Sequence, residues 1–249
     1  MAGRCAGHPL NSQVASGPQL NDQQTKAMAS QPTHREIDAP RCVTPYGSIV
    51  RGDWSSLWIG DRGGSLHRGD GSLRAQRWIS ERWVYHQTQK QSTEHGVATA
   101  PLGHDNTNIS LSFLDEVTAL AAGHRPCDVQ QTVEAKRFLK CWSASHGAQT
   151  FCWYSIDLSL HAERLNAHAR KQLHKASLRD LPDGSMFSAP AGDFLLLGGR
   201  CFLWSTRGYA AAVANGAHDV VDVLTPPSVV GALRAGYEPD IHESILKLM

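Results

Sequence analysis

The stretch SLSFLDEVTALAAGHRP, residues 110–126, is the clearest structural signal in the chain, because it marks both ends of a short helix. Ser112 can cap the helix N-terminus, with Asp115 three residues further on. Gly123 stands where many helices end in a left-handed residue, and Pro126 cannot continue a helix. The sequence therefore predicts a helix that begins after Ser112 and ends before Gly123.

Helical segments are also predicted nearer the C-terminus. Residues 128–142 carry an apolar stripe at helical spacing, formed by Val129, Val133, Ala135, Leu139 and Trp142. A last helix is expected after Pro226 and Pro227, since proline suits the first helical turn. It ends in ALRAGYEP (232–239), which parallels ALAAGHRP (119–126). Both helices are thus expected to stop at a left-handed glycine.

The type of element over residues 156–178 stays open. Four apolar residues at helical spacing favour a helix: Leu158, Leu165, Ala169 and Leu173. An alternation of apolar residues at the start of the segment also permits a strand there: Ile156, Leu158 and Leu160.

Short apolar runs separated by turn residues predict two β regions. The region from Tyr46 to Trp83 is rich in Gly and Trp and favours short strands joined by tight turns. Between Ser185 and Trp204, the runs SMFSA, DFLLLG and CFLWS are separated by PAG and by a Gly-Gly pair. This pattern predicts a three-stranded antiparallel meander. With the helices, it gives an α+β fold with small antiparallel β regions.

One polar segment precedes the expected domain, and a second interrupts it. Residues 1–43 contain few apolar side chains, which show no period, so we expect this N-terminal segment to be disordered. Residues 44–249 are predicted to form a single α+β domain. Within it, a polar stretch near residues 87–108 is expected to be a long loop or a joint between two halves.

Composition limits the classes of function. The 249 residues are 41% hydrophobic and carry a formal net charge of +1, so any nucleic-acid role must depend on a local basic patch. The six cysteines include no Cys-x-x-Cys pair, which favours a reducing compartment over a disulfide framework. The chain shows neither a signal peptide nor about eighteen consecutive apolar residues. We therefore expect a cytoplasmic protein with no membrane partner.

The segment FLDEVTALAAGHRPCD, residues 113–128, resembles the last stretch of the zinc module of Ada-type bacterial regulators of alkylation repair. In that module a cysteine follows Arg-Pro and a second cysteine comes three residues later. Here Cys127 matches the first cysteine, whereas Gln130 stands at the second. The remaining candidate ligands are His67, His124 and Cys127. A closed zinc site needs about four ligands, so neither zinc nor another cofactor is expected.

Pieces spread over Thr44–His242, among them TPYGSI, LPDGSMF and FLWSTRGY, resemble a group of uncharacterised bacterial proteins. The group usually shows Cys-x-x-Cys after the Arg-Pro, so Gln130 marks this chain as divergent. The resemblance implies a single inherited unit without a known activity, and we expect a non-enzymatic bacterial protein whose metal-binding module has lost ligands.

Two alternative functions stay open. If residues 158–178 are helical, then Arg164, His168, Lys171 and Lys175 share one face, and the basic segment 164–179 could contact phosphates of DNA or RNA. An enzyme of unrecognised type is the other alternative, although no catalytic residue stands out. Fragments of a zinc-deaminase motif, His161 and Glu163 with Pro126-Cys127, occur in reversed order and lack the second cysteine.

Overall fold

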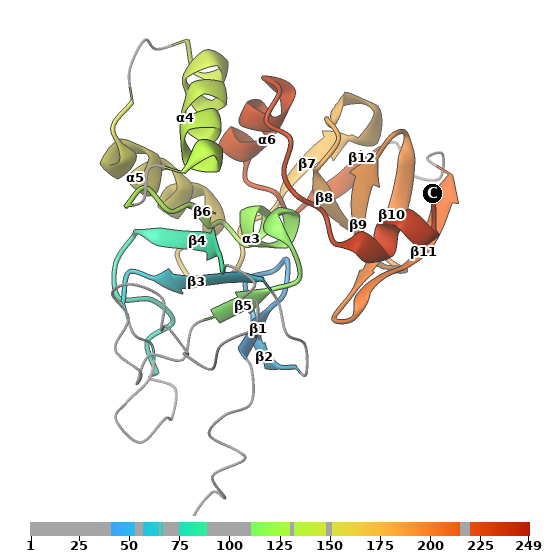
Figure 1. Ribbon diagram of the computed structural model, residues 1–249, viewed down its shortest axis with the longest axis horizontal. Coiled ribbons are helices and arrows are strands. Elements are labelled where there is room, and N and C mark those ends of the chain that lie inside the picture. Colours follow the sequence, from blue (N-terminus) through green and yellow to red (C-terminus); the bar gives the residue numbers. More distant parts are fainter. Residues whose placement is uncertain are drawn as a thin grey trace, which may run out of the picture. The chain divides into compact units, whose positions relative to one another are not determined.

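A computed structural model describes residues 41–52, 57–64, 66, 75–88, 111–129, 132–147, 151–214 and 220–249 (Figure 1). All of these belong to one compact unit, residues 37–249. Residues 1–40 and 89–110 lie outside the described residues, so the disorder expected over 1–43 and the polar loop near 87–108 stay predictions there. Arg41–Val43 form a strand, so ordered structure begins earlier than the sequence predicted.

The first sheet has six short strands in the order β2-β1-β5-β3-β4-β6. Its strands are β1 (Arg41–Val43), β2 (Ile49–Arg51), β3 (Trp58–Arg62), β4 (Trp83–Gln87), β5 (Leu111–Phe113) and β6 (Arg125–Pro126). The pairs β1–β5 and β4–β6 are parallel and the other pairs are antiparallel. The short strands predicted in the Gly- and Trp-rich region are therefore confirmed.

The second sheet has six strands in the order β11-β10-β9-β8-β12-β7, and all neighbours are antiparallel. Its strands are β7 (His174–Ser177), β8 (Met186–Ala189), β9 (Gly192–Leu197), β10 (Arg200–Ser205), β11 (Gly208–Ala214) and β12 (Val220–Val223). Strands β8, β9 and β10 are the predicted meander, which is confirmed and continues into β11. The α+β class is confirmed as well.

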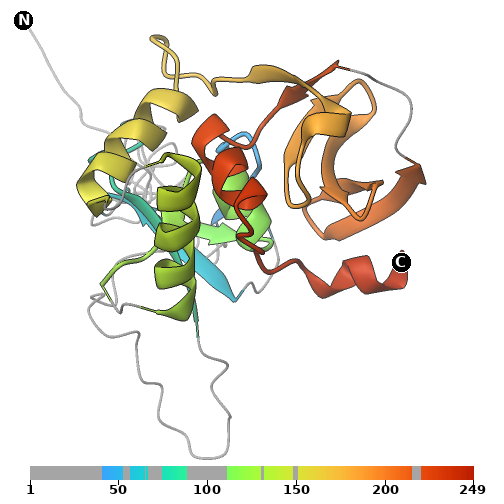
Figure 2. The same cartoon turned by 90° about the horizontal axis from the view of Figure 1, so that it is seen from above.

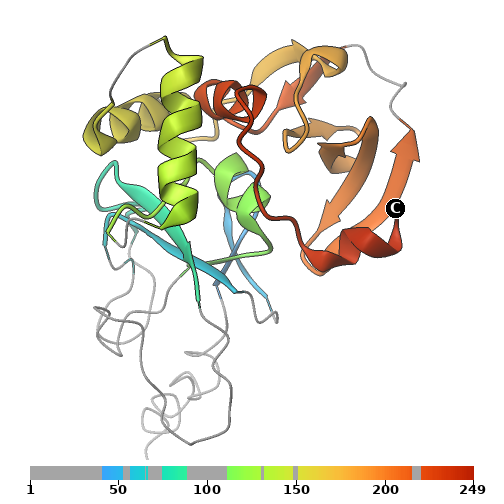
Figure 3. The ribbon, with the colours of Figure 1, turned by 45° about the horizontal axis from the view of Figure 1, so that its top comes forward.

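Four α-helices belong to the described residues: α3 (Glu116–Ala121), α4 (Val133–Ser145), α5 (Trp153–Arg164) and α6 (Pro227–Arg234). Two 3-10 helices, η1 (Leu178–Asp180) and η2 (Glu243–Lys247), complete the fold. Figures 2 and 3 show α4, α5 and α6 gathered on one side of the first sheet. Side chains of these three helices share a hydrophobic core with Trp58, Tyr85 and Phe113 of that sheet.

Helix α3 is buried along its whole length and packs toward both sheets. Its N-terminus is held by two buried carboxylates. The hydroxyl of Tyr209 on β11 donates to Asp115 Oδ2 at 2.8 Å, and the hydroxyl of Tyr85 on β4 donates to Glu116 Oε1 at 2.6 Å. Burial raises the pKa of Glu116, while the hydrogen bonds from Tyr237 and Tyr85 oppose that rise.

The predicted cap of α3 at Ser112 is wrong, whereas the predicted end is confirmed. Ser112 lies within β5, opposite Ile59 and three residues before the observed cap, and its hydroxyl donates to Arg41 O at 3.2 Å instead of capping the helix. Asp115 is the cap instead, and its Oδ1 accepts from Thr118 N at 2.9 Å. Gly123 has φ +87°, the left-handed conformation expected after the last helical turn.

The two following helices are shorter than the sequence suggested. Helix α4 begins at Val133, and Val129 and Val133 are exposed, at 75% and 76%, rather than part of its apolar face. The buried face consists of Ala135, Phe138, Cys141 and Trp142. Helix α5 ends at Arg164, and residues 174–177 form β7, so a helix over 158–178 is wrong.

Candidate anion-binding site

The structure separates the four basic residues that the sequence placed on one helical face. The chain leaves the helix after Arg164, because Leu165 is already extended. Arg164 is buried and Lys171 is partly buried, whereas His168 and Lys175 are exposed. Lys175 forms a surface ion pair with Asp222 on β12 at 2.9 Å. Arg164 and Lys171 are thus the two members of the predicted set that lie together.

A tight turn over residues 165–171 brings Lys171 back beside the end of α5. Leu165 pairs with Lys171 in an isolated antiparallel bridge, and Asn166 Oδ1 accepts from the backbone N–H groups of His168 and Arg170 at 2.9 and 3.1 Å. Ala169 has φ +56°, the one positive φ of a non-glycine residue in the part of the chain that the structure describes. This conformation costs an L-residue roughly 1–2 kcal/mol, so the surrounding contacts must impose it.

Arg164 and Lys171 line a cavity of about 190 Å³ that we call the cationic pocket. Its charged lining residues are Arg62, Arg77, Arg164, Arg170 and Lys171, and none of the described residues that line it is acidic. Its aromatic lining residues are Tyr46, Trp78 and Trp83. Arg62 and Arg164 are buried, whereas Arg77 and Arg170 are exposed, so the pocket has a buried charged interior and an exposed charged rim.

The buried cations donate to uncharged acceptors. Arg62 donates from Nη2 to Gly47 O at 2.6 Å, and Arg164 donates from Nη1 to Gly123 O at 3.0 Å. The Lys171 ammonium donates to Ala121 O. The four ion pairs found among the described residues involve none of these three cations. Carbonyl groups satisfy the N–H donors, and the only carboxylates among the described residues that act on Arg164, those of Asp157 and Glu81, do so from beyond ion-pair distance.

The indole of Trp83 supports both buried guanidinium groups. Arg62 and Trp83 are cross-strand partners in the β3–β4 ladder. The Cζ atoms of Arg62 and Arg164 lie 4.0 and 4.4 Å from the Trp83 ring centroid, within the range of cation–π attraction. The buried Trp83 Nε1 has no hydrogen-bond acceptor among the residues that the structure describes.

Mutual repulsion and burial disfavour positive charge in the pocket. Burial, followed by the charges of Arg164 and Arg62, lowers the pKa of Lys171 to about 7. Burial and the charge of Arg62 also hold the pKa of His124 well below its usual value, so this imidazole is neutral at pH 7. Its Nε2 accepts from Arg62 Nε at 3.4 Å. A bound anion would relieve this repulsion.

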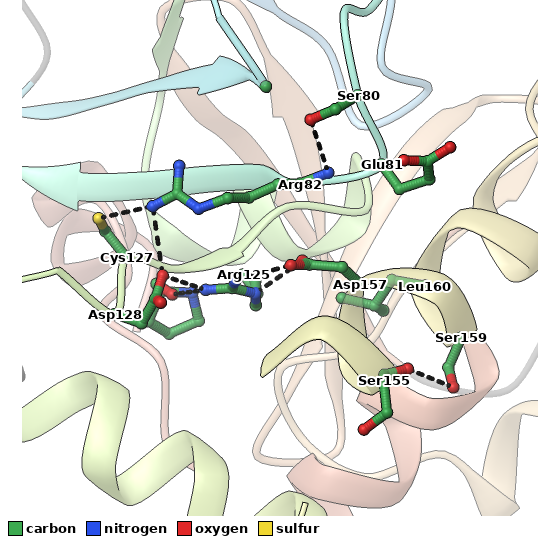
Figure 4. Close-up of polar contacts among 12 residues, drawn as sticks. Ser80, Glu81, Arg82, Arg125, Cys127, Asp128, Ser155, Asp157, Ser159 and Leu160 are labelled. Atoms are coloured by element: carbon green, nitrogen blue, oxygen red, sulfur yellow. Dashed lines mark hydrogen bonds and ion pairs between the residues drawn. The ribbon is translucent and has the colours of Figure 1, made fainter. Parts of the chain in front are cut away.

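The candidate metal ligands have other partners. His124 is buried and packs between Trp83 and Phe113, with ring centroids 5.0 and 4.7 Å away. Cys127 is partly exposed, and its Sγ accepts from the Arg82 guanidinium at 3.6 Å (Figure 4). His67 lies outside the described residues. Among those that are described, no three His, Cys, Asp or Glu residues are grouped to hold a metal ion.

A buried ion pair beside the pocket fixes α5 to β6. Arg125 forms a two-point pair with Asp157, Nε to Oδ1 and Nη2 to Oδ2, each at 2.8 Å (Figure 4). Arg125 also contacts Asp128 at 3.0 Å, and Arg82 reaches the same aspartate at 3.2 Å. Since the Asp157 carboxylate is committed to Arg125, it forms no ion pair with Arg164 on the same helix.

The fragments of a deaminase motif are likewise engaged elsewhere. The Glu163 carboxylate accepts from the backbone N–H of Ser228 at 3.0 Å and from its hydroxyl, which ties α5 to the start of α6. His161 packs against Trp78, with ring centroids 5.6 Å apart. Glu163 and His161 therefore serve to hold α5 against neighbouring segments of the chain.

No protein-family model, curated protein or solved structure matches this chain. Within the residues that the structure describes, every helix is too short or too polar to cross a membrane.

Proposed function

We propose that the protein binds a small oxyanion group, such as a phosphate, in the cationic pocket. The observation that carries this proposal is the convergence of Arg62, Arg164 and Lys171 on one cavity, with no carboxylate at ion-pair distance among the described residues. Burying a single ion without a counter-charge costs several kcal/mol. A sequence that gathers three cations here, with Arg62 and Arg164 buried and Lys171 partly buried, gains from this arrangement when an anion occupies the cavity.

Phosphate suits this lining better than an uncharged ligand does. Guanidinium groups match the oxygens of phosphates and carboxylates in geometry, and hydrogen bonds between charged groups are roughly twice as strong as neutral ones. The exposed Arg77 and Arg170 add positive charge at the rim. The alternative of a DNA- or RNA-associated factor falls within this proposal, because a nucleic acid is one source of such phosphates. It depends on the pocket rather than on a helical stripe.

The proposal retains the expectation of a cytoplasmic, non-enzymatic bacterial protein that holds no zinc at the Ada-like turn. The expectation that this turn holds no zinc is supported by the charges around it. The Arg82 guanidinium lies 3.6 Å from Cys127 Sγ and is paired with Asp128, so a positive charge already occupies the surroundings where a zinc ion would bind. Zinc found at one equivalent in the purified protein and lost in Cys127→Ser would remove this part of the proposal.

Isothermal titration of the full chain with inorganic phosphate tests the site. We expect Lys171→Met to weaken phosphate binding by about tenfold or more, since a hydrogen bond to a charged group contributes about 1.5–3 kcal/mol. Lys175→Met is the matched control, because Lys175 is exposed and pairs with Asp222 outside the pocket, and its affinity should stay within about twofold of wild type. Absence of binding to the wild-type protein, or equal losses in both variants, would contradict the proposal.

Anion affinity should also depend on pH. The pKa of Lys171 is about 7 without an anion, and a bound anion raises it because opposite charge favours the ammonium. Above pH 7, binding of an anion is therefore coupled to protonation of Lys171. The charge of sulfate is constant between pH 7 and pH 9, so the affinity for sulfate should fall over this range because Lys171 loses its proton. The decrease should be at most about tenfold per pH unit. Sulfate titrations at several pH values check this, and Lys171→Met should lose most of the dependence.

A further inference from the structure

The cationic pocket is too small to enclose a ligand of drug size. Its volume is about 190 Å³, whereas pockets that enclose drug-sized ligands span roughly 300–1,000 Å³. A ligand would therefore insert one anionic end and leave the rest at the rim. The inner residues Arg62, Arg164 and Lys171 provide the charge for that end.

The rim has the residue types that favour a nucleobase. Trp78 lines the pocket and is partly exposed, and it stands beside the exposed Arg77. Arg77 is directed to this edge by a hydrogen bond from Nη1 to Ala169 O at 3.3 Å. Indole rings and guanidinium groups both stack on bases, and such stacking tolerates any base because every base has a π-face.

We propose that the pocket binds a nucleoside monophosphate unit, with its phosphate among Arg62, Arg164 and Lys171 and its base against Trp78. This inference depends on the anion site proposed above and adds the identity of the group attached to the phosphate. The unit can come from a free nucleotide or from the 5′-phosphorylated end of a nucleic-acid strand. Both present the same phosphomonoester and base to the pocket.

Titration calorimetry of the full chain with three probes tests the inference: inorganic phosphate, ribose 5-phosphate and adenosine 5′-monophosphate. We expect the nucleotide to bind about fivefold or more tightly than ribose 5-phosphate, because stacking on an aromatic side chain adds that much affinity. Trp78→Leu should reduce this ratio toward one, while Trp78→Phe should retain most of it. Tyr154→Leu, an exposed aromatic residue outside the pocket, should retain the ratio of the wild type.

The outcomes separate this inference from the proposal on which it depends. Equal affinities for ribose 5-phosphate and the nucleotide, both reduced by Lys171→Met, would overturn the nucleotide assignment and leave the anion site in place. Absence of binding by all three probes would overturn both. If Trp78→Leu fails to fold, the wild-type protein still decides: a fivefold preference for the nucleotide over ribose 5-phosphate supports the inference, and a ratio near one overturns it.

A fourth probe identifies the source of the unit. A 5′-phosphorylated tetranucleotide that binds more tightly than the mononucleotide, with little binding by its 5′-hydroxyl form, assigns the site to strand ends. Equal or weaker binding of the tetranucleotide assigns it to free nucleotides. Binding of both tetranucleotides with the same affinity, whether or not they carry the terminal phosphate, would overturn the inference, since the pocket would then not read a phosphomonoester.

Discussion

Replacing Asp157 by alanine is expected to lower the free energy of unfolding by about 3–5 kcal/mol, since it leaves a buried arginine without its main counter-charge. Asp157 holds Arg125 through two hydrogen bonds of 2.8 Å, and the side chains of the two residues are only 6% and 1% exposed. Asp128 contacts Arg125 as well, but it is itself partly exposed and shared with Arg82. Urea denaturation followed by circular dichroism measures the change.

The matched control for this substitution is Asp222→Ala. It breaks the Lys175–Asp222 pair, whose side chains are 69% and 44% exposed, and should cost less than about 1 kcal/mol. Similar losses from Asp157→Ala and Asp222→Ala would mean that burial of the Arg125 pair contributes nothing to stability. The double variant Arg125→Met/Asp157→Leu should recover much of the loss, because it removes both buried charges together.

Gly123→Ala should destabilise the protein by about 2–5 kcal/mol and weaken phosphate binding at the same time. Gly123 has φ +87°, which strains any residue with a Cβ, and an added Cβ would lie 2.8 Å from Cβ of Arg164. Relief of that overlap requires Arg164 to move, and Arg164 donates to the Gly123 carbonyl and lines the pocket. Chemical denaturation and phosphate titration measure the two effects.

The chain contains a matched glycine for this comparison. Gly236 ends α6 with the same Ala-Gly-x-x-Pro pattern and has φ +94°, but an added Cβ would meet no atom within 4 Å. Gly236→Ala therefore reports the backbone strain alone, about 1–2 kcal/mol, with no effect on phosphate binding. Equal behaviour of the two variants would show that the approach of Arg164 to Gly123 does not matter for the site.

Local signals in the sequence predicted the features that depend on local chemistry. Gly123 ends α3 and the Gly-Gly pair at 198–199 joins β9 to β10, because a left-handed residue is needed at each place. The cap of α3 does not follow from the sequence, since Ser112 and Asp115 are both good caps and only the pairing of β5 with β3 decides between them. The sequence pattern also overstates the length of α5, because apolar residues at helical spacing continue past Arg164 through a turn to the start of β7.

The site itself was predictable only in part. The basic pattern of the sequence includes Arg164 and Lys171, but it predicts a helical face that does not form. Arg62 and Trp83 were missed because no sequence pattern relates them, and only the register of β3 against β4 makes them partners. The structure shows what sets Arg62 apart: it ends β3 on the face whose other residues, Trp58 and Gly60, are buried, a position where a charge needs a specific reason. Such sites are assembled by pairing between distant segments.

The most direct test of the account is the pKa of the Lys171 ammonium, measured by heteronuclear NMR with and without saturating phosphate. Because Lys171 lies among Arg62, Arg164 and the neutral His124 without a counter-charge, its pKa should be about 7 in the absence of phosphate and should rise clearly when phosphate binds. A pKa near the usual 10.5, unchanged by phosphate, would mean that the cations are not crowded and that no anion belongs between them.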